Sequence, residues 1–184
     1  VQYRGMEVGS TSRDELVDRG MIYCTEERDL FGFMDVEDNL RLGAYAIDDE
    51  DYVDQQLEFV YDLFPRLEER TEQNARSMSG GEQQMLAIGR ALAGNPDLLL
   101  LDEPSEGIQP SIVQDITDDI ASINEEFGVT VLFVEQNLQV IRELAERCYV
   151  VDGGRIEAEL GGTDLDDAGP VAADPPRGAP RLSH

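Results

Sequence analysis

The run LLLLDEP at residues 98–104 constrains the fold of this chain more than any other stretch. An apolar run of this length without polar alternation, followed by a turn-forming Pro, is typical of a strand that is buried on both faces. A similar run, TVLFV at residues 130–134, follows after one helical pattern. Because buried strands that alternate with helices form parallel sheets, the sequence predicts an α/β fold with a mainly parallel sheet covered on both faces.

The remaining elements are predicted from hydrophobic periodicity. Residues 1–24 have the character of strands, and the pattern is helical at 36–70, 82–93, 112–127 and from 137 onward. The acidic run DDEDYVDQ at 48–55 is expected to form a solvated loop and helix start, and CYVVDGGRIEAEL at 148–160 a hairpin. The positions predicted to face the core are Val36, Leu40, Leu42, Tyr45, Leu57, Val60, Tyr61, Phe64, Leu67, Met85, Ile88, Ala91, Leu92, Ile112, Ile116, Ile120, Ile123, Phe127, Leu138, Ile141, Leu144 and Ala145.

The charge of the chain restricts its partners and its setting. Asp and Glu number 40 against 14 basic residues, which gives a formal charge of -26, yet 41% of residues are hydrophobic, so disorder of the whole chain is excluded. Such a surface attracts neither nucleic acid nor an anionic membrane. Because molar salt screens charges within roughly 3 Å, we expect an extreme-salt cytoplasm; the alternative is an acidic protein from an ordinary cell.

Cysteines and apolar runs indicate the compartment. Cys24 and Cys148 lie far apart in apolar stretches, which favours buried, reduced thiols in a cytosolic protein, and no metal-ligand spacing is found. The apolar runs are too short to cross a bilayer and no signal peptide opens the chain, so a soluble protein is expected.

Two adjacent carboxylates follow the first buried strand. Asp102 and Glu103 come directly after the leucines, and the carboxyl end of a parallel strand lies at the edge where ligands bind. Adjacent acids at one cleft are commonly divided between Mg²⁺ and an attacking water, so Asp102 is the candidate metal ligand and Glu103 the candidate general base. The alternative is a pair of solvent-facing acids that begin a loop.

A second candidate site precedes the helix predicted at 82–93. Ser79, Gly80 and Gly81, followed by Glu82, place unpaired backbone N–H groups and a hydroxyl at the positive end of a helix dipole, an arrangement that suits a phosphate. The alternative is an ordinary glycine-rich helix start capped by Ser79.

The order of these features is similar to that in one family. The stretch MSGGEQQMLAIGRALAGNPDLLLLDEPSEGIQP resembles the signature motif, Walker B strand and D-loop of an ATP-binding-cassette (ABC) ATPase, and the resemblance extends over about residues 1–157. YCTEERDLFGFMDVEDNL resembles the Q-loop region and the start of the helical subdomain, and VEQN the switch. The resemblance implies a P-loop NTPase (ABC-type) α/β core with a mainly parallel sheet and an inserted helical subdomain.

Two departures from the common pattern point to one branch of that family. Glu26 stands at the Q-loop position, where Gln is usual, and Gln136 at the switch position, where His is usual. This combination is similar to an ATP-binding subunit of branched-chain amino acid uptake systems; related subunits import urea and short amides. Because an amide stabilises charge less well than a protonated imidazole, the switch step differs from that of most members.

The resemblance implies roles and partners. ATP and Mg²⁺ are the expected cofactors, and two ATP-binding subunits close head to tail so that Ser79, Gly80 and Gly81 of one clasp the γ-phosphate held by the other. Glu103 orients the water, while Gln136 senses the phosphate. Glu26 reaches the metal or its water. Membrane permease subunits and, indirectly, a substrate-binding protein are the further partners, at the cytoplasmic face of the cell membrane; no nucleic acid is expected.

The implied domain organisation has four parts. Residues 1–30 form a partial nucleotide-binding core with the Q-loop, 31–92 the helical subdomain that docks on the permease, 93–160 the rest of the α/β core, and 161–184 a disordered acidic, Pro/Gly-rich tail.

The chain contains no Lys, and its sole His is His184. The phosphate loop of such ATPases, with its Lys, is therefore expected upstream of Val1, together with the first strands. Two hypotheses follow: these residues are the C-terminal part of an ATPase that drives import, or they form a non-catalytic module that acts only with a complete partner. A third, a cassette ATPase of translation or DNA repair, is disfavoured by the acidic surface and VEQN.

Overall fold

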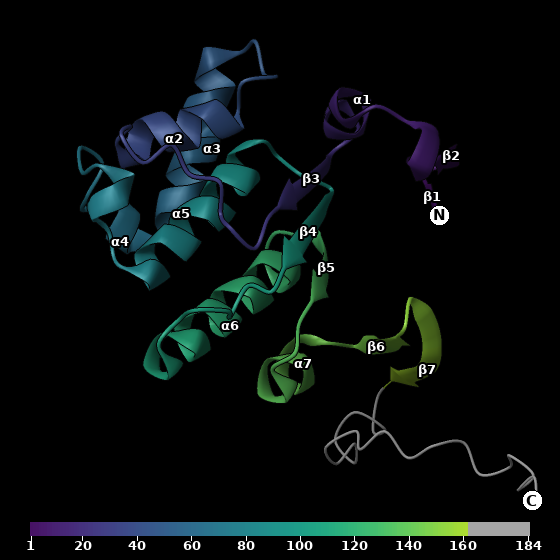
Figure 1. Ribbon diagram of the computed structural model, residues 1–184. Helices are drawn as coiled ribbons and strands as arrows, with labels where there is room; N and C mark the ends of the chain where they lie inside the picture. Colours follow the sequence, from purple (N-terminus) through teal and green to yellow (C-terminus); the bar gives the residue numbers. More distant parts are fainter. Residues whose placement is uncertain (162–184) are drawn as a thin grey trace, which may run out of the picture. The chain divides into compact units, whose positions relative to one another are not determined.

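The computed structural model describes residues 1–161 (Figure 1). The chain divides into two compact units, Val1–Leu144 and Ala145–His184, which are described separately below. The predicted tail at 161–184 lies, apart from Gly161, outside the described residues. The four-part division proposed from the sequence stays a prediction.

A three-stranded parallel sheet organises the first unit. Its strands are β3 (Met21–Cys24), β4 (Leu98–Asp102) and β5 (Thr130–Val134), in the order β3-β4-β5. β4 is central, with Leu101 paired to Cys24 on one side and to Phe133 on the other. The parallel sheet expected from the two apolar runs is therefore present, and the carboxyl ends of all three strands lie at one edge.

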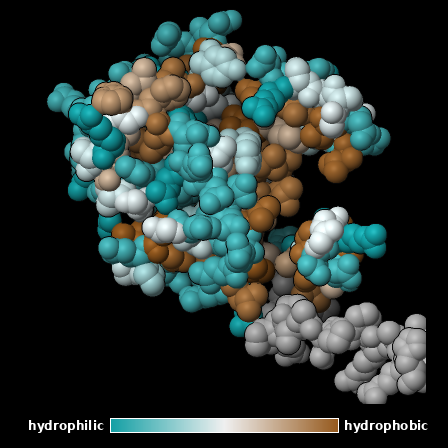
Figure 2. Space-filling view, in the orientation of Figure 1, coloured by the Kyte–Doolittle hydropathy of each residue, from teal (hydrophilic) through white to brown (hydrophobic). Residues whose placement is uncertain are grey.

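One face of this sheet is covered and the other is exposed among the described residues. α5 (Gly80–Ala93) packs on β3 and α6 (Pro110–Glu125) on β5, and Leu99 and Leu101 are fully or almost fully buried. On the opposite face Tyr23, Leu132 and Val134 are more than half exposed, and Figure 2 shows hydrophobic residues at the surface beside these strands. Within the first unit, Val1–Leu144, the prediction of a sheet covered on both faces is thus wrong.

The long helical pattern predicted at 36–70 is divided into three helices, α2 (Val36–Gly43), α3 (Glu50–Leu63) and α4 (Pro65–Glu68). Asp49 caps α3, as the acidic run predicted. α2 ends at Gly43, where a Cβ would lie 1.8 Å from the Arg90 carbonyl oxygen, so this glycine allows α2 to pack closely on α5. Tyr45 lies beyond the end of α2 and is exposed, and Leu42 on α2 is partly exposed, both against the prediction.

The predicted inward positions of α5 are confirmed: Met85, Ile88, Ala91 and Leu92 are all buried. In α6 three isoleucines are buried, whereas Phe127 follows the helix and stacks edge-on against Phe59 of α3. α7 (Leu138–Leu144) begins within one residue of the predicted start, but its buried residue is Val140, whereas Leu138, predicted to face the core, is exposed. Cys24 is buried, and burial raises its thiol pKa to about 11.

The amino-terminal segment contains a helix that the sequence did not predict. A short hairpin, β1 (Gln2–Tyr3) with β2 (Met6–Glu7), leads to α1 (Arg13–Asp18), which Ser12 caps. Two single-turn 3₁₀ helices, η1 (Val8–Ser10) and η2 (Ala75–Ser77), complete the unit. No helix within residues 1–161 is long and apolar enough to span a membrane.

The described part of the second unit is the predicted hairpin. β6 (Arg147–Asp152) pairs antiparallel with β7 (Arg155–Gly161). Its turn uses Gly153 and Gly154, both with positive φ, which glycine adopts without steric cost.

Candidate functional site

Asp102 ends the central strand β4 at the carboxyl edge of the sheet. Its Oδ2 atom accepts a 2.7 Å hydrogen bond from the hydroxyl of Tyr23 on the neighbouring strand. That bond raises the pKa of the Tyr23 phenol, because the phenol keeps its proton while it faces a carboxylate. One oxygen of Asp102 is thus fixed by the protein, at the position predicted for a metal ligand.

Glu103 forms a sharp turn directly after β4. Its backbone lies in the left-handed region at φ 45°, which is uncommon for a residue other than glycine, and its N–H donates a 2.9 Å hydrogen bond to the Val134 carbonyl. The turn carries the Glu103 side chain toward the segment that follows β5. There the Gln136 amide donates a 2.6 Å hydrogen bond to Oε1 of Glu103. Glu103, expected to orient the water, and Gln136, expected to sense the γ-phosphate, are therefore in direct contact.

Further carboxylates surround this pair. The Glu106 carboxyl hydrogen-bonds to Glu103, which lowers the pKa of Glu103, with Gln136 as the second cause, and raises the pKa of Glu106. Glu135 accepts hydrogen bonds from the hydroxyl and the backbone N–H of Ser105. These contacts join the loop 103–107 to the end of β5.

The residues present fit a magnesium ion that is shared with phosphate. Within residues 1–161 no group of three His, Cys, Asp or Glu could hold a metal ion by itself. Mg²⁺, however, commonly takes one or two protein carboxylates and completes its shell with water and phosphate oxygens. Asp102 has the hard oxygen donor and the location for this role. Glu26 lies in the loop after β3, where its negative charge contributes to the raised pKa values of Tyr23 and Glu106.

Ser79 and Glu82 form a reciprocal cap at the start of α5. The Ser79 side chain accepts from the Glu82 N–H at 3.4 Å, while Oε2 of Glu82 accepts from the Ser79 N–H at 2.9 Å and from its hydroxyl at 2.8 Å. These bonds lower the pKa of Glu82. The Ser79 hydroxyl, predicted to bind phosphate, is thus turned toward Glu82, so it must rotate before it can donate to a ligand.

The two glycines behind Ser79 have different environments. At Gly81 a Cβ would lie 2.8 Å from Ile112 of α6, so this glycine is required for the packing of two helices. At Gly80 the nearest atoms to a Cβ are the Gly107 carbonyl oxygen at 3.7 Å and the Arg28 guanidinium at 3.8 Å. Gly80 therefore lies beside the loop that follows Glu103.

Sequence reasoning missed Arg28 and Gln84, which connect these segments. Arg28 follows Glu26 and donates from Nε to Oε1 of Gln84 at 2.8 Å and from Nη2 to the Glu106 carbonyl at 3.1 Å. An arginine in a charged loop and a glutamine in a helix carry no distinctive pattern. The one clue in the sequence is helical spacing. Gln84 falls on the same face of α5 as Ile88 and Ala91, which indicates a polar side chain at a buried position.

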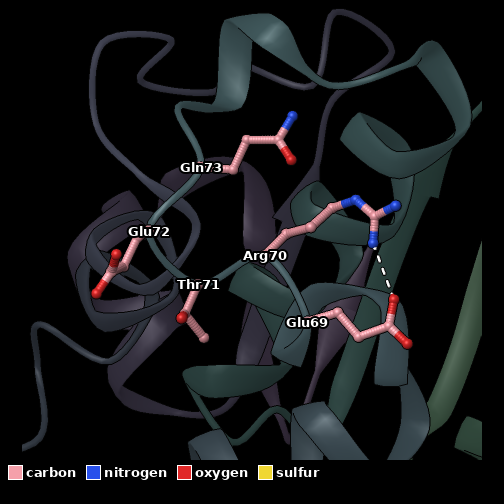
Figure 3. Close-up of a pocket in the computed structure, with 5 residues that line it drawn as sticks. All are labelled: Glu69, Arg70, Thr71, Glu72 and Gln73. Carbon is pink, nitrogen blue, oxygen red and sulfur yellow. Dashed lines mark hydrogen bonds and ion pairs between the residues drawn. The ribbon is translucent and has the colours of Figure 1, made fainter.

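A shallow hollow lies elsewhere on the first unit, along the loop 69–73 (Figure 3). In this view Glu69, Arg70 and Gln73 point to one side of the loop and Thr71 and Glu72 to the other. It contains none of the predicted site residues. Arg70 of this loop does contact one of them, since its Nε lies 3.2 Å from the Glu82 carboxylate that caps α5.

Comparison with known proteins agrees with the sequence motifs. Residues 1–106 match the family described as ABC transporter. The chain is 47% identical over 156 residues to the high-affinity branched-chain amino acid transport ATP-binding protein BraG of Pseudomonas aeruginosa, covering 85% of this chain and 66% of that protein. It is 33% identical to the probable branched-chain amino acid transport ATP-binding protein LivF of Archaeoglobus fulgidus, covering 83% of this chain and 64% of that protein. The chain thus spans just under two thirds of the length of these relatives.

Solved structures support the fold. An ATP-binding cassette of an ABC transporter in its ADP conformation superimposes with a TM-score of 0.78 at 23% identity, covering 90% of this chain and 70% of that one. A nucleotide-free cassette gives 0.75 at 22% identity, with the same coverage. The predicted fold class, an ABC-type P-loop NTPase core with a parallel sheet, is confirmed. Because the ABC transporter family model matches more than half of its length, this chain belongs to the ABC transporter family.

Proposed function

We propose that this protein is an ATP-hydrolysing subunit of an ABC importer and that branched-chain amino acids are the cargo. The observation that carries the proposal is the contact between Glu103 and Gln136, formed where two neighbouring parallel strands end and beside Asp102. The similarity to the BraG and LivF proteins, whose names state branched-chain amino acid transport, supports the cargo.

Glu103 is the proposed general base. Its ionised carboxylate takes a proton from water as the water oxygen bonds to the γ-phosphorus of ATP, and the bond from that phosphorus to the bridging oxygen breaks to release ADP. Gln136 fixes one oxygen of Glu103 and so orients the other toward the water. Asp102, with Glu26 nearby, would hold Mg²⁺, which neutralises charge on the phosphates when bound.

A second copy or a related ATP-binding subunit would complete the site. Ser79, Gly80 and Gly81 present the N-terminal end of a 14-residue helix, where backbone N–H groups and the helix dipole favour a phosphate held by the partner. No Lys occurs among the 184 residues, so a lysine that holds the β- and γ-phosphates is not among them. This is consistent with relatives that are longer than the present chain.

Permease docking is proposed at an aromatic patch formed by Phe31, Phe33 and Met34. Phe33 is 82% and Phe31 54% exposed, and the guanidinium of Arg76 lies 4.6 Å from the Phe33 ring centre. Exposed aromatic residues grouped in this way are typical of protein interfaces. Through this patch the protein would lie at the cytoplasmic face of the membrane, with a substrate-binding protein acting on the other side.

Substitution of the general base tests this function. In the natural protein, Glu103→Gln keeps the size and the hydrogen-bonding shape of the side chain but removes its basicity, and ATP hydrolysis should fall by about 10²- to 10⁴-fold. ATP-bound dimers should persist, as measured by light scattering with excess ATP. Glu125→Gln, an exposed change on α6, is the matched control. Hydrolysis at the wild-type rate in Glu103→Gln would remove Glu103 from this role.

A further inference from the structure

Arg28 makes two hydrogen bonds that join separate parts of the candidate site. Nε donates to Oε1 of Gln84 on α5, and Nη2 donates to the main-chain carbonyl of Glu106 in the loop 103–107. The planar guanidinium has donors in a fixed fork, so one side chain reaches both acceptors at once. Arg28 therefore ties the helix that begins at the signature segment to the loop that begins at Glu103.

Both acceptors are held in place by their own surroundings. Gln84 is only 3% exposed, and its Oε1 has no other hydrogen-bond donor among the contacts of the described residues. Glu106 is fixed by its N–H, which donates to the Glu103 carbonyl at 3.0 Å. Movement of α5 relative to the loop would break one of the two bonds to Arg28, and the break at Gln84 would leave a buried acceptor unpaired.

The backbone of Arg28 is held as well. Arg28 has φ 66° and Asp29 φ 45°, so two successive residues lie in the left-handed region. Arg90 on α5 donates to the carbonyl oxygens of both, at 2.9 Å to Arg28 and 2.8 Å to Asp29. A conformation that non-glycine residues rarely adopt is thus maintained by a second arginine. The loop after Glu26 is rigidly joined to α5, and the Arg28 guanidinium lies beside Gly80.

We propose that Arg28 is a positioning residue that couples the two ATP sites of the dimer. This inference rests on the proposed function. The signature segment faces the nucleotide of the partner, whereas Glu103 acts on the nucleotide of its own subunit. Arg28 joins the start of α5, the helix that begins at Gly80, to the loop after Glu103. Closure of the signature segment on one ATP therefore moves the general base that acts on the other ATP.

The coupling is tested by the cooperativity of ATP hydrolysis in the natural protein. If the proposal is right, wild-type hydrolysis has a Hill coefficient above unity, and a wild-type value of unity would overturn it. Arg28→Met keeps the aliphatic stem but removes both donors, so the Hill coefficient should fall to unity and kcat should fall about tenfold, with little change in the ATP concentration at half-maximal rate. Arg28→Lys restores the charge but not the fork, so it should not restore the Hill coefficient. Arg13→Met, on the exposed α1, is the control. Cooperativity that survives in Arg28→Met, or returns with Lys, would overturn the proposal.

A second variant separates coupling from damage to folding. In Arg28→Met the buried Oε1 of Gln84 loses its donor. The double variant Arg28→Met/Gln84→Met removes that acceptor as well. The double variant should regain thermal stability without regaining cooperativity; recovery of both would make the role of Arg28 purely structural.

Amide hydrogen exchange gives a readout that does not need hydrolysis. We call the two hydrogen bonds from Arg28, to Gln84 and to the Glu106 carbonyl, the clamp. Its loss in Arg28→Met should speed exchange at the Glu106 amide by about tenfold relative to Arg13→Met. Wild-type protein that does not hydrolyse ATP would refute the proposed function, and unchanged exchange would independently refute the clamp.

Discussion

The amide nitrogen of Gln136 lies 2.6 Å from Oε1 of Glu103, and this contact crosses from the end of β5 to the end of β4. Gln136 thus holds one oxygen of the Glu103 carboxylate, and the Glu106 carboxyl makes a further hydrogen bond to the same carboxylate. A protonated imidazole at this position would bring a positive charge, whereas the amide brings orientation alone. In the proposed site, Gln136 therefore acts through orientation, at the position where the resemblance to ABC ATPases makes His the expected residue.

Replacement of Gln136 should separate orientation from charge. Gln136→Ala frees the Glu103 carboxylate to rotate, and kcat should fall about tenfold to a hundredfold because the base is no longer aligned. Gln136→Glu keeps the size but places two carboxylates in contact, so it should be more damaging than Ala at neutral pH. Steady-state ATP hydrolysis by the natural protein measures both. Gln139→Ala on α7 is the control, and equal rates for Ala and wild type would contradict the orienting role.

The elements that local patterns determine were predictable from the sequence. The apolar runs of β4 and β5, the inner face of α5 and the Asp-Gly-Gly turn follow from burial and backbone preferences. The location of Asp102 and Glu103 at the carboxyl end of a buried parallel strand also followed from the sequence.

Contacts that depend on tertiary packing were not predictable. The end of α2 depends on the approach of α5 at Gly43, so Tyr45 was wrongly placed in the core. The positive φ of Glu103 comes from its bond to Val134, since glutamate itself does not favour that region. The clamp from Arg28 to Gln84 joins residues 56 positions apart that show no pairing pattern.

Asp119 should make stability depend on pH. Burial of Asp119, which lies on α6, raises the pKa of its carboxyl from 3.8 to about 7. Repulsion from Asp115 and Asp118 adds to the shift, and attraction to Arg66 opposes it. The folded state therefore binds more protons than the unfolded state between these values. Stability contributed by this group is complete below about pH 4 and is lost as pH rises through about 7.

The comparison of Asp119→Asn with wild type measures this effect. Because Asn cannot ionise, the variant should match wild type near pH 4 and be more stable near pH 8, in urea unfolding at constant salt. Glu125→Gln, on the exposed end of the same helix, should show no such trend. If Asp119→Asn differs from wild type in stability by the same amount at both pH values, the substitution acts through packing and not through the ionisation of Asp119.

The formal charge of -26 should make stability depend strongly on salt. At 0.1 M salt charges interact over about 10 Å, and at 1 M over about 3 Å, so added KCl should screen repulsion in the folded chain and raise the unfolding midpoint. Strengthened apolar burial could raise it as well, and a charge-reduced variant distinguishes the two causes. Asp51→Asn, Glu58→Gln and Asp62→Asn remove three exposed charges from α3. If repulsion is the cause, this variant unfolds later than wild type at 0.1 M KCl and the difference closes by 2 M; a constant difference would place the salt effect in the apolar core.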